Sequence, residues 1–114
     1  MAWNNRRRGK YNATKTEYNG IKFDSKKECN RYIKLKALED AGEIHDLKLQ
    51  VKFEIQPHFK HNGQTIRAIN YFADFTYYDK NDKIHVEDTK GFKTPEYLLK
   101  KKLLLFRGIE ITEV

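Results

Sequence analysis

The chain has 114 residues, enough for one domain with a single hydrophobic core and too few for two. Its 23 Lys and Arg residues against 16 Asp and Glu residues give a net charge of +7, which favours an anionic partner, nucleic acid before membrane. On charge alone, the alternative is a basic soluble protein with no such partner. The single cysteine excludes an internal disulfide framework, and no apolar run approaches the roughly 20 residues that span a bilayer. We therefore expect a cytoplasmic protein that does not enter a membrane.

The first 20 residues predict a basic, flexible N-terminal arm. No acidic residue precedes Glu17, and the cations of this segment include Arg6, Arg7, Arg8 and Lys10. Such an arm could hold a nucleic-acid backbone, or it could serve solubility alone. Residues 21–114 are then the folded domain.

The next segment predicts a helix over roughly residues 25–41. Asp24 or Ser25 can cap its start, apolar residues recur at helical spacing, and Gly42 ends it.

Alternating apolar residues then predict three antiparallel strands. The first two flank a hairpin turn at Asn62-Gly63, and the third covers about residues 84–90. Thr94-Pro95 marks the start of a second helix, and residues 109–114 alternate as a last strand. The expected fold is α+β: a helix, three antiparallel strands, a helix and a strand, in a mixed sheet flanked by helices.

Carboxylates occupy strand positions where a sheet favours apolar side chains. If Asp74 pairs directly across from Asp88, residues 80–82 form a three-residue loop, which is a common hairpin length. Opposed Cβ atoms lie roughly 4.5–5.5 Å apart, so the two carboxylates repel each other unless a cation lies between them. Strand alternation places Lys90 on the same face as Asp88. The three side chains are therefore expected to converge on one small area.

This grouping suits metal-assisted hydrolysis of a phosphodiester. Carboxylate oxygens hold Mg²⁺, the metal accepts a phosphate oxygen and polarises a water, and an ammonium orients that water or neutralises charge. Glu28 is a fourth candidate, because helical spacing directs it from the first helix toward the sheet. Its alternative role is a capping box with Ser25. For the whole group, the alternative is a structural Asp–Lys pair in a sheet.

The segments "ADF" (73–75) and "VEDTKG" (86–91) resemble the bipartite signature of the PD-(D/E)XK nuclease superfamily. Together with "FDSKKE", "LQVKFEIQP" and "IRAINYFADFTYYD", they make the chain similar, over roughly residues 11–114, to small phage and prophage endonucleases described as Holliday-junction-resolvase-like. The resemblance implies a restriction-endonuclease-like core in residues 21–114 and a Mg²⁺ cofactor for which Mn²⁺ can substitute. It also implies a homodimer if the protein resolves junctions, and a location in the bacterial host cytoplasm if a phage encodes it. Ala73 departs from the pattern, because it replaces the proline that names the motif.

Carried over by position, the resemblance implies catalytic roles for Glu28, Asp74, Asp88 and Lys90. Asp74, Asp88 and the backbone carbonyl of Thr89 would bind the metal, with Glu28 as a further ligand.

Other polar residues are candidates for contacts with the nucleic acid. Gln50 and Gln56 match polar family positions near the scissile phosphate, and strand-edge hydrogen bonding is their alternative role. Basic residues in or beside the second helix could contact phosphates, unless they only solvate a helix face; they are Lys93, Lys100, Lys101, Lys102 and Arg107.

The sequence thus predicts a Mg²⁺-dependent DNA endonuclease that hydrolyses phosphodiester bonds. We expect it to select branched DNA, in phage DNA recombination or processing. The alternative is a non-catalytic nucleic-acid-binding protein with a nuclease-like fold. Action on RNA is also open.

Overall fold

The computed structural model describes residues 15–89 and 93–114. The described residues form an α+β fold with a mixed sheet and two helices. The elements in chain order are β1 (Thr16–Tyr18), β2 (Ile21–Phe23), α2 (Lys26–Asp40), β3 (Ile44–Gln56), β4 (Phe59–His61), β5 (Gln64–Ile66), β6 (Ile69–Asp79), β7 (Ile84–Asp88), α3 (Pro95–Phe106) and β8 (Ile111–Glu113).

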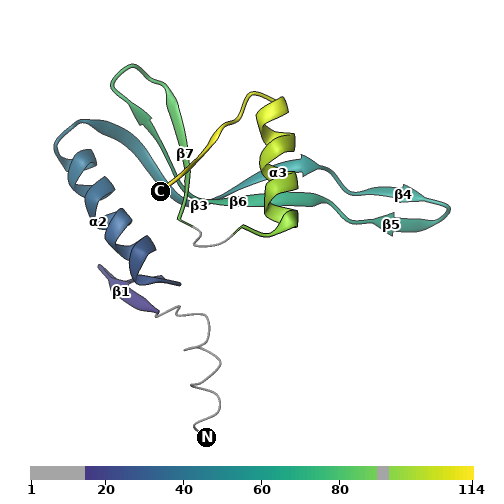
Figure 1. Ribbon diagram of the computed structural model, residues 1–114, viewed down its shortest axis with the longest axis horizontal. Helices are drawn as coiled ribbons and strands as arrows, with labels where there is room; N and C mark the ends of the chain where they lie inside the picture. Colours follow the sequence, from purple (N-terminus) through teal and green to yellow (C-terminus); the bar gives the residue numbers. More distant parts are fainter. Residues whose placement is uncertain (1–14, 90–92) are drawn as a thin grey trace, which may run out of the picture.

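A four-stranded sheet in the order β3-β6-β7-β8 forms the centre of the molecule (Figure 1). β6 pairs antiparallel with both β3 and β7, and β8 runs parallel to β7. The predicted succession of a helix, three antiparallel strands, a helix and a strand is therefore confirmed. The mixed sheet follows from the connection through α3, which returns the chain alongside β7.

The predicted hairpin at Asn62-Gly63 is also present, but the strands beside it are shorter than expected. Both turn residues have positive φ (50° and 78°), as a two-residue type I′ turn requires. β4 and β5 flank this turn as a separate two-stranded unit. The break before β4 falls at Pro57, which has no N–H to donate to a strand ladder.

A second hairpin lies at the start of the described chain. β1, which the sequence analysis assigned to the flexible arm, pairs antiparallel with β2. Asn19 and Gly20 form its turn, with φ of 55° and 77°. The rest of the predicted arm, residues 1–14, lies outside the described residues.

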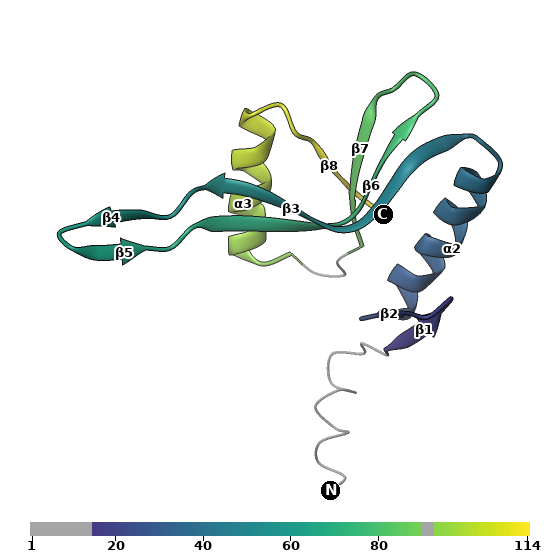
Figure 2. The same cartoon turned by 180° about the vertical axis from the view of Figure 1, so that it is seen from behind.

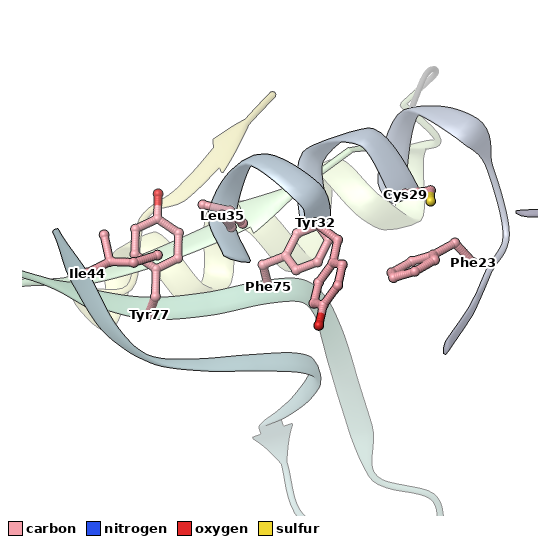
Figure 3. Packing of buried hydrophobic residues seen from close by; sticks show 7 residues of the cluster. All are labelled: Phe23, Cys29, Tyr32, Leu35, Ile44, Phe75 and Tyr77. Carbon is pink, nitrogen blue, oxygen red and sulfur yellow. The ribbon is translucent and has the colours of Figure 1, made fainter. Parts of the chain in front are cut away.

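The first predicted helix is confirmed as α2. The Ser25 side chain accepts a hydrogen bond from the N–H of Glu28 at 3.1 Å and caps the N-terminus. Gly42, with φ of 79°, follows the C-terminus in the left-handed conformation that glycine tolerates best. The buried side of α2 packs on the sheet in a cluster shown in Figure 3, formed by Phe23, Cys29, Tyr32, Leu35, Ile44, Phe75 and Tyr77.

α3 covers a different part of the sheet. Thr94 caps it by accepting a hydrogen bond from the N–H of Tyr97 at 3.0 Å, and Pro95 occupies the first turn, as predicted. The apolar cluster under α3 consists of Tyr71, Ala73, Val86, Tyr97, Leu104 and Ile111.

β6 changes its partner helix at Asp74. Phe75 and Tyr77 belong to the α2 cluster, whereas Tyr71 and Ala73 belong to the α3 cluster. All four positions are odd-numbered, so in a flat strand their side chains would lie on one face and pack against the same helix. They pack against two helices instead, and Asp74 lies between the two pairs, where β6 passes from one helix to the other.

Candidate active site

The pairing of β6 with β7 has the register predicted from the sequence. Phe75 lies opposite Glu87 and Tyr78 lies opposite Ile84. Asp82 in the connecting turn has φ of 59°, which an aspartate tolerates better than most residues. The pairing ends at Phe75 and Glu87, and Asp74 and Asp88 are the next residues along the two strands.

The Asp74 carboxylate is held by the residue that follows β7. Oδ2 of Asp74 accepts hydrogen bonds from the backbone N–H and from the hydroxyl of Thr89, each at 2.8 Å. Thr89 is buried, so both donors act away from bulk water. Of the Thr89 groups, only the backbone carbonyl was predicted at this site, so the N–H and hydroxyl donors are additions to the prediction.

Gln50 joins Asp74 to Glu28. Its Nε2 donates to Oδ1 of Asp74 at 3.2 Å and to Oε2 of Glu28 at 3.0 Å. The neighbours of Gln50 on β3 pair with the neighbours of Asp74 on β6, so the two residues face each other across the strands. Gln50 itself has φ of 51°, a conformation that costs energy for a residue other than glycine. The predicted residues Glu28, Gln50 and Asp74 are therefore brought together from α2, β3 and β6.

Negative charge is concentrated at this position. Burial raises the pKa of Glu28 above its ordinary value, and the charge of Asp74 raises it further, while the Gln50 hydrogen bond opposes the shift. A backbone hydrogen bond from Asp24 also lowers this pKa. Among the described residues, no Lys or Arg forms an ion pair with either Glu28 or Asp74.

Asp88 is fully buried on the side of the sheet that α3 covers. Its Oδ2 accepts a hydrogen bond from the hydroxyl of Tyr71 at 2.5 Å, and its backbone carbonyl accepts from the N–H of Val114 at 3.0 Å. Burial and the Asp88 hydrogen bond raise the pKa of Tyr71, and the charge of Asp74 adds to the shift. The two carboxylates therefore act on the same hydroxyl.

The Glu87 side chain points to the other side of β7, where it binds a residue of α2. Its two carboxylate oxygens bind Arg31, and Oε2 also accepts from the Tyr77 hydroxyl. Of the two adjacent acidic residues, Asp88 therefore shares a side with Tyr71 and Val86, while Glu87 is neutralised on the opposite side.

The donor chemistry at this site fits a hard divalent cation such as Mg²⁺. Carboxylate oxygens are the ligands that such ions prefer, and a cation would offset the burial and the Asp74 charge that raise the pKa of Glu28. The carboxylates are nevertheless directed at Gln50, Thr89 and Tyr71, and within residues 15–89 and 93–114 no group of three or more His, Cys, Asp or Glu side chains is arranged to hold a metal ion. Each carboxylate oxygen has a further lone pair, so a carboxylate can accept these hydrogen bonds and still bind an ion after a change of side-chain position.

Several predicted site residues lie outside the described residues. These are the predicted catalytic lysine, Lys90, and the cations of the arm, Arg6, Arg7, Arg8 and Lys10.

Two of the predicted DNA-binding lysines are engaged by one carboxylate. Lys101 and Lys93 lie 2.9 Å and 3.1 Å from the carboxylate oxygens of Glu113, which also accepts from the hydroxyl of Tyr97 at 2.8 Å. Hydrogen bonds from Lys101, Tyr97 and Lys93 lower the pKa of Glu113 to about 2. β8 places Glu113 directly beside Asp88, so this network borders the candidate site.

The remaining candidates are dispersed. Lys100 pairs with Glu96 at 2.9 Å, Lys102 is exposed on α3, and Arg107 donates to the backbone carbonyls of residues 54 and 55. Gln56 lies six residues beyond Gln50 on β3, roughly 20 Å along an extended strand. The structure therefore brings Gln50, but not Gln56, to the carboxylates.

Three residues at this site were missed by the sequence analysis: Tyr71, Tyr97 and Glu113. Buried tyrosine hydroxyls need a hydrogen-bond partner, and here the partners are Asp88 and Glu113. The signal for these tyrosines was weak, because an alternating strand and a helix both accept tyrosine as an apolar residue.

The fold and site define an α+β protein in which an acidic cluster lies where β6 passes between two helices. The chain belongs to the DUF1064 family, described as proteins of unknown function, whose sequence model matches residues 8–113. No curated protein and no solved structure matches it. In the part of the chain that the structure describes, no helix is long and apolar enough to cross a membrane.

Proposed function

We propose that this protein is a Mg²⁺-dependent DNA endonuclease that hydrolyses phosphodiester bonds on a restriction-endonuclease-like core. The observation that supports the proposal best is the bridge from Glu28 through Gln50 to Asp74, with Asp88 next to the Phe75–Glu87 pair on the neighbouring strand. Gln50 thus joins carboxylates from a helix and a strand, and Asp88 follows Glu87 on the neighbouring strand, in a chain whose net charge is +7. A basic protein attracts a polyanion, and an acidic site within it requires a cation to accept a phosphate.

Asp74 and Asp88 would hold the metal ion, together with the Thr89 backbone carbonyl and with Glu28. The bound Mg²⁺ would polarise a water and stabilise negative charge on the phosphate. Mn²⁺, which accepts the same oxygen ligands, would substitute for it.

The chain's own residues have separate tasks in this proposal. Thr89 holds one oxygen of Asp74 through two hydrogen bonds, so the carboxylate has a fixed orientation. Gln50 keeps Glu28 and Asp74 together in spite of their repulsion. Lys90, which follows Thr89 in the chain, would orient the attacking water or neutralise charge at the phosphate.

The preferred substrate in this proposal is branched DNA, in recombination or processing of phage DNA. A four-way junction presents two strands for symmetric cutting, so its resolution would use a homodimer with paired sites.

Cleavage of labelled DNA tests the proposal. The wild type and Asp74→Asn are incubated with four-way-junction, duplex and single-stranded DNA, with Mg²⁺ or with EDTA. Asp82→Asn is the matched control, because it makes the same change at the far turn of the β6–β7 hairpin, where asparagine tolerates the positive φ of 59°. We expect Mg²⁺-dependent incision by the wild type and the control, and a loss of at least about 100-fold in Asp74→Asn. Equal cutting by a folded Asp74→Asn protein would refute the assigned site.

One observation favours a second candidate, a non-catalytic DNA-binding protein. Both oxygens of Asp74 already accept hydrogen bonds, from Gln50 and Thr89, so the carboxylate is satisfied without a metal. This candidate predicts salt-sensitive DNA binding with no cleavage in Mg²⁺ or Mn²⁺. The same incubations, followed by a binding assay in EDTA, separate the two functions.

A further inference from the structure

The β4–β5 hairpin extends beyond the body of the protein. Figure 1 and Figure 2 both show it projecting past α3, at the end of the ribbon formed by β3 and β6. Every residue from Pro57 to Arg67 is exposed. These residues contribute nothing to either apolar cluster, so the fold does not account for them.

The composition of this projecting hairpin differs from that of the rest of the chain. No acidic residue occurs between Glu54 and Asp74, although the chain has 16 of them. The hairpin itself contains Lys60, Arg67, His58 and His61. An exposed segment with cations and no carboxylate suits a polyanionic partner.

The two faces of the hairpin carry different chemistry. Phe59 pairs with Ile66, and both are unusually exposed for apolar side chains, at 47% and 37%. His61 pairs with Gln64, two residues along on the same face. Lys60 and Thr65 point to the other face, and Arg67 follows Thr65 at the same spacing. One face therefore carries two apolar residues, with His61 and Gln64 nearer the turn, and the other face carries the two cations.

The geometry points to the β4–β5 hairpin as a duplex-DNA-binding arm that lies in the major groove. This inference rests on the proposed function for the identity of the polyanion. The major groove is about 12 Å wide and admits a two-stranded β-ribbon. The face of Phe59 and Ile66 contacts base edges and thymine methyl groups, with Gln64 available for hydrogen bonds to a base. The long side chains of Lys60 and Arg67 reach phosphates at the rim of the groove.

The reach of the arm matches the dimensions of DNA. Gly63 at its tip is 11 residues before Asp74, which corresponds to at most roughly 35 Å of extended chain. One turn of B-DNA advances about 34–36 Å. An arm in the groove can therefore hold the duplex about one helical turn from a phosphate placed at the carboxylates.

Binding of a fluorescent duplex in EDTA, measured by anisotropy at several salt concentrations, tests the arm. The test variant is Lys60→Ala/Arg67→Ala. The matched control is Lys80→Ala/Lys83→Ala, which removes two exposed cations from the turn of the β6–β7 hairpin and so changes the net charge equally. Each phosphate contact contributes about 0.9 to the slope of log K against log salt, so loss of two contacts lowers the slope by roughly 2 and weakens binding about tenfold near 0.1 M salt. Phe59→Ala should weaken binding several-fold and leave the slope unchanged, since no charge is removed.

The outcomes separate this inference from the nuclease proposal. If the arm variant binds with the affinity and slope of the control, or if the wild type binds no duplex, the inference is wrong. A change in sedimentation of the arm variant with unchanged DNA binding would also overturn it, because the arm would then bind a second copy of the chain. Arm-dependent binding in a wild type that never cuts DNA would sustain the arm and reject the nuclease.

Discussion

Arg31 of α2 forms a two-point ion pair with Glu87 of β7. Nε lies 2.8 Å from Oε1, and Nη2 lies 2.6 Å from Oε2. Such a pairing of guanidinium and carboxylate is stronger and more directional than a single contact. The ion pair with Arg31 holds Glu87 on the α2 side of β7. Because Asp88 is the next residue of the strand, its carboxylate then lies on the opposite side.

Substitution of Arg31 by methionine should destabilise the protein strongly. Only 3% of the Glu87 side chain is exposed, so the variant leaves a buried carboxylate without its cation. We expect the free energy of unfolding to fall by about 3 kcal/mol. This is the lower end of the range for breaking a buried ion pair, because Arg31 is partly exposed to solvent. Urea unfolding measures it, with Lys34→Met as an exposed control on the same helix. A loss no greater than that of the control would contradict a stabilising role for the pair.

Substitution of Tyr71 by phenylalanine tests the support of Asp88. The change keeps the ring in the α3 cluster and removes the hydroxyl that donates to Oδ2 of a fully buried carboxylate. Loss of a donor to a buried charged group costs about 1–3 kcal/mol, and urea unfolding should show a loss in that range. The exposed Tyr18 provides a control as Tyr18→Phe, which should change stability by less than about 0.5 kcal/mol. Equal effects of the two variants would mean that the Tyr71 hydroxyl does not support Asp88.

The parts of the fold that the sequence predicted well depend on local chemistry. The start of α2 follows from the capping side chain of Ser25, and its end follows from Gly42. The β6–β7 register follows from a short loop with Asp82 in the left-handed conformation. The same reasoning could have found the β1–β2 hairpin, because Asn19-Gly20 is the dipeptide that also forms the turn at residues 62–63.

The details of the site depend on contacts between distant elements, which periodicity does not reveal. Nothing local indicates that Gln50 adopts φ of 51° and bridges two carboxylates 22 and 24 residues away. The transfer of β6 from the α2 cluster to the α3 cluster at Asp74 likewise arises from packing of the whole sheet. Strict alternation of side chains between two faces assumes a flat strand. It therefore does not predict which helix the side chains of β6 contact on either side of Asp74.

Glu28→Gln should stabilise the protein at neutral pH when no divalent cation is present. The folded-state pKa of Glu28 is raised above 4.5, mainly by burial and then by Asp74, so the charged form is disfavoured in the folded state. This penalty is fully present above the folded-state pKa and disappears as the pH falls below the unfolded value of about 4.5. Glutamine avoids the charge while keeping the shape.

Urea unfolding of both proteins in EDTA, between pH 7 and pH 4, measures this effect. The stability advantage of Glu28→Gln should be largest near neutral pH and should shrink as the pH falls toward 4. Carboxylates that do not interact with Glu28 titrate equally in the two proteins, so the difference reports Glu28 together with its coupling to Asp74. An advantage that grows at low pH would mean that Glu28 is stabilised in its charged form, contrary to the repulsion from Asp74.

Addition of Mg²⁺ should raise the melting temperature of the wild type, because an ion that binds only the folded state stabilises it. At about 100 times its dissociation constant, such an ion adds about 2.7 kcal/mol, which corresponds to a rise of roughly 10 °C for a domain of this size. The rise should be abolished in Asp74→Asn, which removes the charge of a proposed ligand, and retained in Asp82→Asn, which makes the same substitution at the far turn. Calorimetric scans with and without Mg²⁺ at constant ionic strength measure it. An equal rise in Asp74→Asn would place the bound ion elsewhere, because the repulsion between Glu28 and Asp74 that a cation relieves at this site is absent from that variant.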